Sequence, residues 1–517
     1  MASIWNWKVS NRCLVSLQIF QEPRKPVRFP DGFEIFAVEI IATREKAMCC
    51  VECLFCTSFS IFVIINPEKS DNGVNGMSLK NRIEKYQPQM IQTLKELVRF
   101  KSVRSEAKPG APYGEENARC LKRALEIAEE LGFQTHNMDG HMGWAEYGEG
   151  KEMIAVAGHL DVVAGGDGWT VCDPFEPMIK DEKMFGRGTM DNKGPIVISL
   201  YALKALIDEG FKPKRRIRIL MGCDEENGSE CMKYYCKNGG EAPVAGFTPD
   251  ASFPLIQGEK GHMKLTLCKK FTQTEGWKLM NIQGGVASNV VPQYAKAELL
   301  ADDKIEVIEA DGISAHASTP QHGENAIGKL CLKLKELPLA AEAKEAIEFV
   351  ADKLGVEYTG ETLGVNFSDE PSGPVTLNLG MISCDTENQE TSLQIVLDSR
   401  CPVTFGYDDL VPVIKETFAS NGWEVAEESW SDSIYKADDS EIVQKLLGVY
   451  RSITGDHSPA YCIGGGTYAK DIPNILAFGA EKQGEDHHIH GADEYIGLEQ
   501  MVESGYIFAE AMKALAE

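Results

Sequence analysis

The sequence lacks several features that would identify a function at once. It contains none of the motifs H-E-x-x-H, G-x-x-x-x-G-K-[ST], G-x-S-x-G or G-x-G-x-x-G, so the usual zincin, P-loop, serine hydrolase and dinucleotide-binding classes have no support. It also has no basic excess, because 78 acidic residues against 52 basic ones give a formal net charge of −26. Since a phosphate backbone needs a basic surface, we exclude a nucleic-acid partner. The acidic excess is typical of a solvated protein surface.

Long apolar runs are missing as well. The two longest candidates, Cys13–Phe20 and Cys53–Ile65, are shorter than the roughly 20 apolar residues that span a bilayer. No small-residue cleavage site of a secretory signal follows the first of them. Ten of the 15 cysteines are scattered singly beyond residue 76, without the spacing of a disulfide framework. We therefore expect a reduced, cytoplasmic protein with no membrane anchor.

Residues 1–76 differ from the rest of the chain. They carry eight basic and eight acidic side chains, so the whole net charge of −26 belongs to residues 77–517. Cys50, Cys53 and Cys56 are spaced like part of an iron–sulfur run, but the fourth cysteine and its proline are absent, so we expect no metal there. Met77 then opens a strongly helical stretch. Our hypothesis is that Met77 is the true start and that residues 1–76 are a mis-called extension, which an intact mass of the native protein would test.

From Met77 onward, helical and strand patterns alternate, which is typical of an α/β fold with a mostly parallel sheet and flanking helices. Between about residues 262 and 434 the apolar residues alternate instead, which predicts antiparallel strands with a few helices. We expect one α/β domain in two parts, 77–261 and 435–517, interrupted by an α+β domain at 262–434 with an antiparallel sheet.

Several groups of histidines and acidic residues follow predicted strands. His159 and Asp161 come directly after the apolar run 153–157, and residues two apart in an extended segment point the same way. A carboxylate in that position can receive an imidazole N–H and fix the tautomer of a metal-binding histidine. The other groups are Asp191 before a helix, Asp224–Glu226 after the run 217–221, Asp250 after the run 245–248, and Asp486–Glu494 after the run 475–478.

Each of these groups alone has an ordinary explanation, such as a helix cap, a solvated turn or a turn aspartate. Together they bring two histidines and four carboxylates to one edge of the sheet, where open α/β folds bind their ligands. Mixed histidine and carboxylate ligands without cysteine fit catalytic Zn²⁺, with Mn²⁺ or Co²⁺ as alternatives. Five ligands and one spare glutamate suit two metal ions and a general base.

This ordered series resembles the co-catalytic zinc exopeptidase family, which includes carboxypeptidases, aminoacylases, acetylornithine and succinyl-diaminopimelate deacylases and carnosinases. The likeness is strongest to the bacterial peptidase V dipeptidases and covers about residues 77–517. The resemblance implies two Zn²⁺ per chain. Its implied ligands are Asp191 as the bridging carboxylate, His159 and Asp250 at one ion, and Glu226 and His490 at the other.

The same resemblance implies that Glu225 is the general base and that Asp161 orients His159. Three histidines lie close together near the C-terminal end of the series. We select His490 because Glu494 follows it by four residues, as in the family, and His487 or His488 is the alternative.

The interrupting domain is similar to the family's lid, and the remaining body to its catalytic domain. An enlarged lid of about 173 residues stands in for a partner subunit, so the resemblance implies a monomer. It also assigns the residues that contact a small peptide. They are His316, which polarises the scissile carbonyl, Asn289, which reaches the substrate, and Arg400 with the turn residues Gly465, Gly466 and Thr467, which hold the substrate's free carboxylate.

The expected function is that of a dinuclear zinc dipeptidase, which hydrolyses short peptides with a free C-terminus by means of a metal-bridging water. An N-acyl amino acid deacylase of the same family is the alternative, because both enzymes cleave an amide beside a carboxylate. A non-catalytic peptide-binding relative is disfavoured, since every expected ligand and the base are present.

Overall fold

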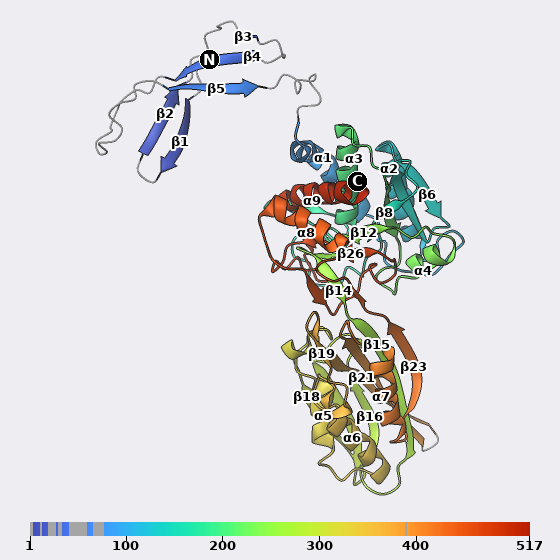
Figure 1. Ribbon diagram of the computed structural model, residues 1–517. Helices are drawn as coiled ribbons and strands as arrows, with labels where there is room; N and C mark the ends of the chain where they lie inside the picture. The colour runs from blue at the N-terminus through green and yellow to red at the C-terminus, as the bar shows by residue number, and fades with distance from the viewer. Residues whose placement is uncertain are drawn as a thin grey trace. The chain divides into compact units, whose positions relative to one another are not determined.

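The computed structural model describes residues 4–10, 13–18, 27–28, 34–40, 59–65, 77–387 and 390–517 (Figure 1). The chain divides into two compact units, Met1–Ser78 and Leu79–Glu517. In the first unit, β1 (Ile4–Ser10) pairs with β2 (Cys13–Gln18), and β3 (Val27–Arg28), β4 (Glu34–Ile40) and β5 (Phe59–Ile65) form a second antiparallel sheet. The cysteine run at 50–56 lies outside the described residues.

The second unit contains a sheet whose central strands are parallel. Its order is β24-β14-β26-β12-β8-β11-β7-β6, and β25 also pairs with β14. The central strand β8 pairs in parallel with β11 and β12, and it is buried at every position because its sequence is apolar up to the final histidine. The strands are β6 (Gln134–Met138), β7 (Met142–Tyr147), β8 (Met153–His159), β11 (Arg216–Gly222), β12 (Ala245–Thr248), β14 (Ile256–Glu259), β24 (Ile434–Tyr435), β25 (Tyr461–Ile463) and β26 (Ile475–Ala477).

Helices complete the core around this sheet. Helix α3 is buried along most of its length and packs against α1, α9 and β8, while α2 packs on β6 and β7. A helix that is apolar on most faces belongs in a protein interior, and α3 is such a helix. The helices are α1 (Leu79–Val98), α2 (Glu115–Glu130), α3 (Lys193–Glu209), α4 (Glu230–Lys237), α8 (Glu441–Thr454) and α9 (Leu498–Ala516).

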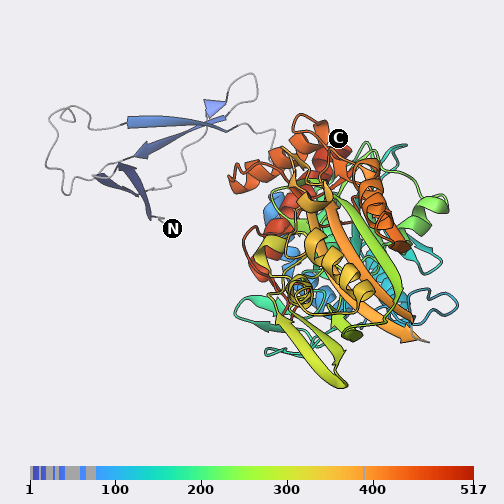
Figure 2. The same cartoon turned by 90° about the horizontal axis from the view of Figure 1, so that it is seen from below.

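A separate sheet, entirely antiparallel, has the order β18-β17-β16-β21-β22-β15-β23. Helices α5 and α6 lie along this sheet, as the yellow helices in Figures 1 and 2 show, and they share its own apolar core. The elements are β15 (Gly261–Thr272), β16 (Lys278–Gly284), β17 (Tyr294–Ala301), β18 (Lys304–Asp311), α5 (Ala326–Leu334), α6 (Ala341–Lys353), β21 (Thr376–Glu387), β22 (Glu390–Cys401), α7 (Tyr407–Ala419) and β23 (Glu424–Ser431).

Short strands form three smaller sheets. The first pairs β13 (Ala251–Ser252) with β27 (Ala480–Glu481), and the second has three strands, β28 (Tyr495–Gly497), β10 (Lys183–Phe185) and β9 (Met178–Lys180), with β10 in the middle. The third pairs β19 (Ser368–Asp369) with β20 (Gly373–Pro374). The predicted fold class, a mostly parallel sheet with flanking helices plus an α+β part with an antiparallel sheet, is confirmed.

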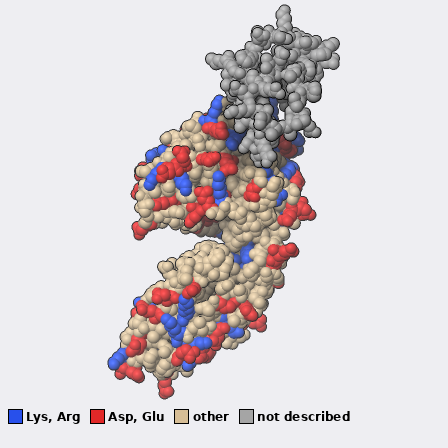
Figure 3. Space-filling view, turned by 90° about the vertical axis from the view of Figure 1, so that its left-hand side faces the viewer, with Lys and Arg blue, Asp and Glu red and all other residues tan. Residues whose placement is uncertain are grey.

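The distribution of charged and apolar side chains describes the surface of the second unit and the composition of the helices. Asp and Glu side chains are spread over the face of residues 79–517 that Figure 3 shows, where water solvates them. Among the described residues, no helix combines the length and the apolar composition that crossing a bilayer requires.

Candidate metal centre and substrate cavity

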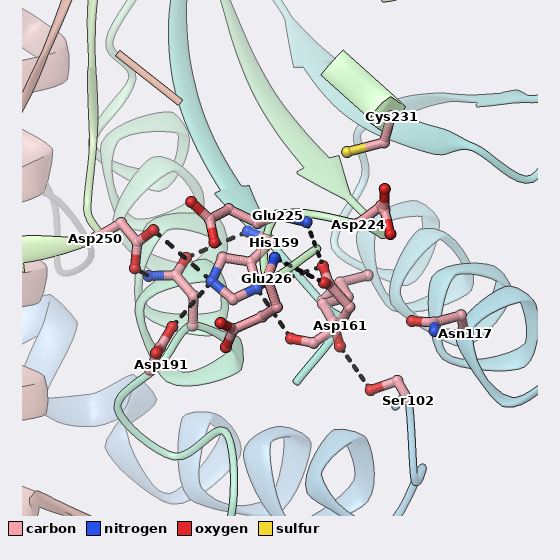
Figure 4. Close-up of polar contacts among 12 residues, drawn as sticks. Ser102, Asn117, His159, Asp161, Asp191, Asp224, Glu225, Glu226, Cys231 and Asp250 are labelled. Atoms are coloured by element: carbon pink, nitrogen blue, oxygen red, sulfur yellow. Dashed lines mark hydrogen bonds and ion pairs between the residues drawn. The ribbon is translucent and has the colours of Figure 1, made fainter. Parts of the chain in front are cut away.

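The candidate site lies at the carboxyl ends of three neighbouring parallel strands. His159 is the last residue of β8, Glu225 and Glu226 follow the end of β11, and Asp250 follows the end of β12. Because β8 lies between β11 and β12, these strand ends meet at one edge of the sheet. Figure 4 shows the four acidic side chains Asp191, Glu225, Glu226 and Asp250 gathered around the imidazole of His159.

His159 is oriented by Asp161, mainly through the backbone. Its Nδ1 lies 2.9 Å from the carbonyl oxygen of Asp161 and 3.5 Å from the Oδ1 atom, so the carbonyl is its hydrogen-bond partner. This leaves Nε2 facing the carboxylates, 2.9 Å from Asp191 Oδ1 and 3.7 Å from Asp250 Oδ2. A hydrogen bond at one ring nitrogen fixes which nitrogen is free to bind a metal.

The carboxylate of Asp161 has a second role that the sequence did not predict. Its two oxygens accept hydrogen bonds from the backbone N–H groups of Glu225 and Glu226, each at 3.1 Å. The side chain that follows β8 therefore holds the loop that follows β11. Asp224, by contrast, turns away to Arg104, with Nη1 of the arginine 2.8 Å from Oδ1.

Asp191 lies between the two histidines. Its Oδ1 is 2.9 Å from His159 Nε2, and its Oδ2 is 2.9 Å from His490 Nε2. The same His490 nitrogen lies 3.1 Å from Glu226 Oε2. One carboxylate therefore contacts both histidines, with a different oxygen for each.

The neighbouring histidines have other partners. His487 Nε2 lies 3.4 Å from Gln500 Nε2, and His488 Nδ1 lies 3.2 Å from the carbonyl oxygen of Ala492. Of these three histidines, the structure brings His490 to the carboxylates.

Burial and neighbouring charges shift the pKa values of the side chains in this cluster. Burial raises the pKa of the Glu225 carboxyl well above its ordinary value, and the nearby Asp250 carboxylate raises it further. Burial also raises the pKa of Glu226 and of Asp250. Hydrogen bonds to Asp191 and Glu226 raise the pKa of His490 to about 10. Crowded, buried carboxylates of this kind are stabilised by a cation placed among them.

The donor atoms fit a divalent metal ion. Two sets of donors each lie within 4.8 Å of one another, His159 with Asp191 and Glu226, and His159 with Glu225 and Asp250. Imidazole nitrogens and carboxylate oxygens together are ligands of zinc and related ions. A cavity of about 180 Å³ opens beside them, and its lining includes Asp191, Glu225, Glu226, Asp250, Gly466, Thr467, Glu481 and His490.

Residues outside the predicted set support the cluster. Glu494 is fully buried and pairs with Arg187, whose Nη1 lies 2.7 Å from Oε2. Its Oε1 accepts hydrogen bonds from the backbone of Met190 at 2.9 Å and of Asp191 at 3.1 Å. Glu494 therefore fixes the segment that carries Asp191, and its only sequence signal was the spacing from His490.

Asn192 connects the two sides of the cluster. Its Nδ2 donates to Asp250 Oδ1 at 2.9 Å, and its Oδ1 accepts from the backbone N–H of His159 at 3.3 Å. An asparagine before a helix is usually a cap, so the sequence carries no signal for this role of Asn192, whose side chain makes no cap hydrogen bond.

Arg400 lies where the antiparallel sheet meets the turn Gly464–Thr467, called the glycine turn below. Its Nε donates to Asp398 at 3.0 Å and its Nη1 to the carbonyl oxygen of Gly464 at 3.0 Å, while Nη2 has no hydrogen-bond partner among the described residues. Asp398 also accepts a hydrogen bond from His262 Nε2 at 2.8 Å. A guanidinium held on two sides, with one edge free, can bind a carboxylate.

Glu259 fixes the glycine turn through two hydrogen bonds from Thr467. Thr467 donates to this buried carboxyl through its backbone N–H at 3.0 Å and through its hydroxyl at 2.7 Å. Burial raises the pKa of Glu259 to about 7. Gly464 lies next to Arg400, and Gly466 and Thr467 line the cavity.

His316 and Asn289 lie close together, because His316 pairs with Val290 in an isolated β-bridge, and neither lines the cavity. His316 Nδ1 is 2.7 Å from Ser318 Oγ, and Asn289 accepts the backbone N–H of Ala317 on its carbonyl oxygen at 2.9 Å. Burial and the nearby Arg400 lower the pKa of His316, which keeps it neutral near pH 7. A side chain added at Gly464 would lie 2.6 Å from the Ser318 Cβ, so this segment touches the glycine turn.

Known proteins are similar to this chain in sequence or in fold. The profile of "Peptidase family M20/M25/M40" matches residues 155–514. A Bacillus subtilis (strain 168) protein named "Putative dipeptidase YtjP" is 34% identical over an alignment of 459 residues, and the match covers 83% of this chain and 97% of that protein.

Two solved structures share the fold at lower identity. Aminoacylhistidine dipeptidase from Vibrio alginolyticus is 15% identical with a TM-score of 0.54, and the match covers 85% of this chain and 98% of that one. The M20 family metallo-carboxypeptidase Sso-CP2 from Sulfolobus solfataricus is also 15% identical with a TM-score of 0.54, covering 83% and 99%.

Proposed function

This chain belongs to peptidase family M20/M25/M40, and we propose that it is a metallo-dipeptidase that hydrolyses short peptides with a free C-terminus. The observation that carries the proposal is the position of Asp191, which presents one oxygen to His159 and the other to His490 beside the cavity. The name of the Bacillus relative, which matches over nearly its whole length, agrees with this activity.

We propose two Zn²⁺ per chain, with Mn²⁺ or Co²⁺ as alternatives. Asp191 would hold both ions, His159 and Asp250 the first, and Glu226 and His490 the second. When bound, the ions would polarise the peptide carbonyl and lower the pKa of water. The donor set supports the assignment, and so does the burial that raises the pKa of Glu225, Glu226 and Asp250.

Side chains of this chain would carry out the proton transfer and hold the substrate and the ligands in position. Glu225 would take a proton from the attacking water and deliver it to the leaving amine, because its carboxyl lines the cavity and is not among the five proposed ligands. Asp161 keeps the His159 ring and the Glu225–Glu226 backbone in place. His316 would donate to the developing oxyanion, and Asn289 would contact the substrate beside it. Because neither lines the cavity, both would have to approach it as the substrate binds.

The carboxylate of the substrate would bind between Arg400 and the turn Gly465–Thr467. We expect Arg400→Ala to lower kcat/KM for a dipeptide roughly 10- to 150-fold, since a hydrogen bond to a charged group contributes about 1.5–3 kcal/mol. The loss should fall mainly on KM and should shrink for the dipeptide amide, which carries no carboxylate. Steady-state kinetics on both substrates measure it, with the exposed Arg119→Ala as the control.

An N-acyl amino acid deacylase is the rival within the same family, because both reactions cleave an amide beside a carboxylate. A panel of free dipeptides, N-acetyl amino acids and N-succinyl amino acids separates them. We expect the free dipeptides to have the highest kcat/KM. A higher kcat/KM for the acylated compounds would instead assign the chain as an N-acyl amino acid deacylase. Peptide binding by a protein that holds no metal and cleaves none of the compounds would assign it as a non-catalytic peptide-binding protein.

We further propose the domain roles that follow from this function. Residues 77–261 and 435–517 would form the catalytic domain, and residues 262–434 the lid. A lid of this size would leave the enzyme monomeric, which light scattering after gel filtration would test. We also propose that the enzyme acts in the cytoplasm.

A further inference from the structure

Glu481 is a cavity residue that the proposed mechanism does not use. It ends β27, which pairs in parallel with β13, and β13 follows directly after the proposed ligand Asp250. Its side chain lines the same cavity as Asp191, Glu226 and His490. A substrate lying against the proposed metal centre would therefore lie against Glu481 as well.

The carboxyl of Glu481 has no counter-charge. Its Oε2 accepts one hydrogen bond from Ser252 Oγ at 3.2 Å. Throughout the described part of the chain, no Lys, Arg or His nitrogen lies within 4 Å of it. The neighbouring cavity residues Ala251, Ala480 and Ile489 are apolar. A half-buried carboxylate in such surroundings is costly unless a cation or further donors reach it.

The proposed mechanism gives Glu481 no role. Asp191, Glu226 and Asp250 are proposed ligands and Glu225 is the proposed base, whereas Glu481 is a fifth carboxyl side chain on the lining of the same cavity. Burial raises the pKa of Glu481 to about 7. A cation that enters the cavity and reaches this carboxyl would therefore stabilise its charged form.

We propose that Glu481 binds a positively charged group of the substrate and so determines which substrates the enzyme prefers. This inference rests on the proposed peptidase function of the same cavity. An ammonium or guanidinium group would form a charge-assisted hydrogen bond with the free oxygen of Glu481. A dipeptide offers such a group from two sources, its α-ammonium and a basic side chain, whereas a neutral N-acyl amino acid offers none.

The test compares Glu481→Gln with the unmodified, metal-loaded enzyme on two matched pairs of substrates. Glycyl-alanine and N-acetyl-alanine differ only by the α-ammonium, and glycyl-lysine and glycyl-norleucine differ only by the side-chain ammonium. Where N-acetyl-alanine is not cleaved, its inhibition constant takes the place of kcat/KM. The exposed Glu499→Gln provides the same change of charge outside the cavity.

We expect Glu481→Gln to lower kcat/KM about 10-fold or more for the charged member of one pair, with little change for the neutral member. A loss on all three dipeptides but not on N-acetyl-alanine assigns the α-ammonium, and a loss on glycyl-lysine alone assigns the side chain. Equal effects on all four substrates, or no effect, would overturn the proposal.

Two further readouts keep the result interpretable. Metal content and the melting temperature of Glu481→Gln should equal those of the unmodified enzyme, and Glu481→Asp, which keeps the charge, should retain most of the preference. The unmodified enzyme's own rates on the four substrates test the dipeptidase function independently. Failure to cleave any dipeptide would reject that function, whereas the ratio of variant to unmodified enzyme judges Glu481 alone.

Discussion

Replacing Glu225 by Gln is expected to lower kcat by about two to four orders of magnitude, which is the usual contribution of a positioned general base. Glutamine has the same shape as glutamate, but its amide cannot accept the proton of the attacking water. The five proposed metal ligands are unchanged by this substitution, and the backbone N–H of residue 225 can still donate to Asp161 at 3.1 Å. Metal content should therefore stay the same while turnover is lost.

Steady-state kinetics together with metal analysis by mass spectrometry measure both quantities. KM should change much less than kcat, because Glu225 acts on the proton and not on the substrate's carboxylate. Turnover close to that of the unmodified enzyme would remove Glu225 from the role of base. Loss of metal together with turnover would instead assign Glu225 as a ligand, as its closeness to His159 and Asp250 would allow.

Replacing Asp191 by Asn should abolish activity by a different route, namely loss of metal. Asp191 is the residue that lies 2.9 Å from both His159 and His490, so its carboxylate joins the two halves of the centre. An amide presents one oxygen and no charge, and it cannot serve two cations. We expect bound metal to fall from two ions per chain towards one or none, and kcat to fall at least about a thousandfold.

The exposed Asp167→Asn makes the same chemical change away from the cavity and should keep both metal and activity. Full metal content and high activity in Asp191→Asn would contradict the bridging role. Because Glu494 holds the Asp191 backbone independently of its side chain, the variant should stay folded, which circular dichroism would check.

The residues at the strand ends could be predicted because each follows a short apolar run directly. His159 closes β8, and Asp250 comes two residues after β12, so the order of parallel strands alone brings them together. The choice of His490 among three histidines depended on the family spacing to Glu494. The structure places His490, and neither His487 nor His488, next to Asp191.

The supporting contacts could not be predicted, because they join residues that are far apart in sequence and have no pattern of their own. Arg187 and Glu494 form an ion pair although they lie about 300 positions apart in the sequence, and the Asp161 carboxylate binds the backbone of the loop that contains Glu225. The antiparallel edge formed by β6 and β7 was also not foreseen, since a short alternating run does not tell whether its neighbour is parallel.

The most direct test of the metal-dependent dipeptidase assignment is dipeptide hydrolysis measured before chelation, after chelation, and after Zn²⁺, Mn²⁺ or Co²⁺ is added back, with bound metal counted at each step. We expect two ions per chain in the active protein, loss of activity as they are removed, and recovery when one of these metals returns. Unchanged hydrolysis by protein that has been freed of metal would contradict the assignment.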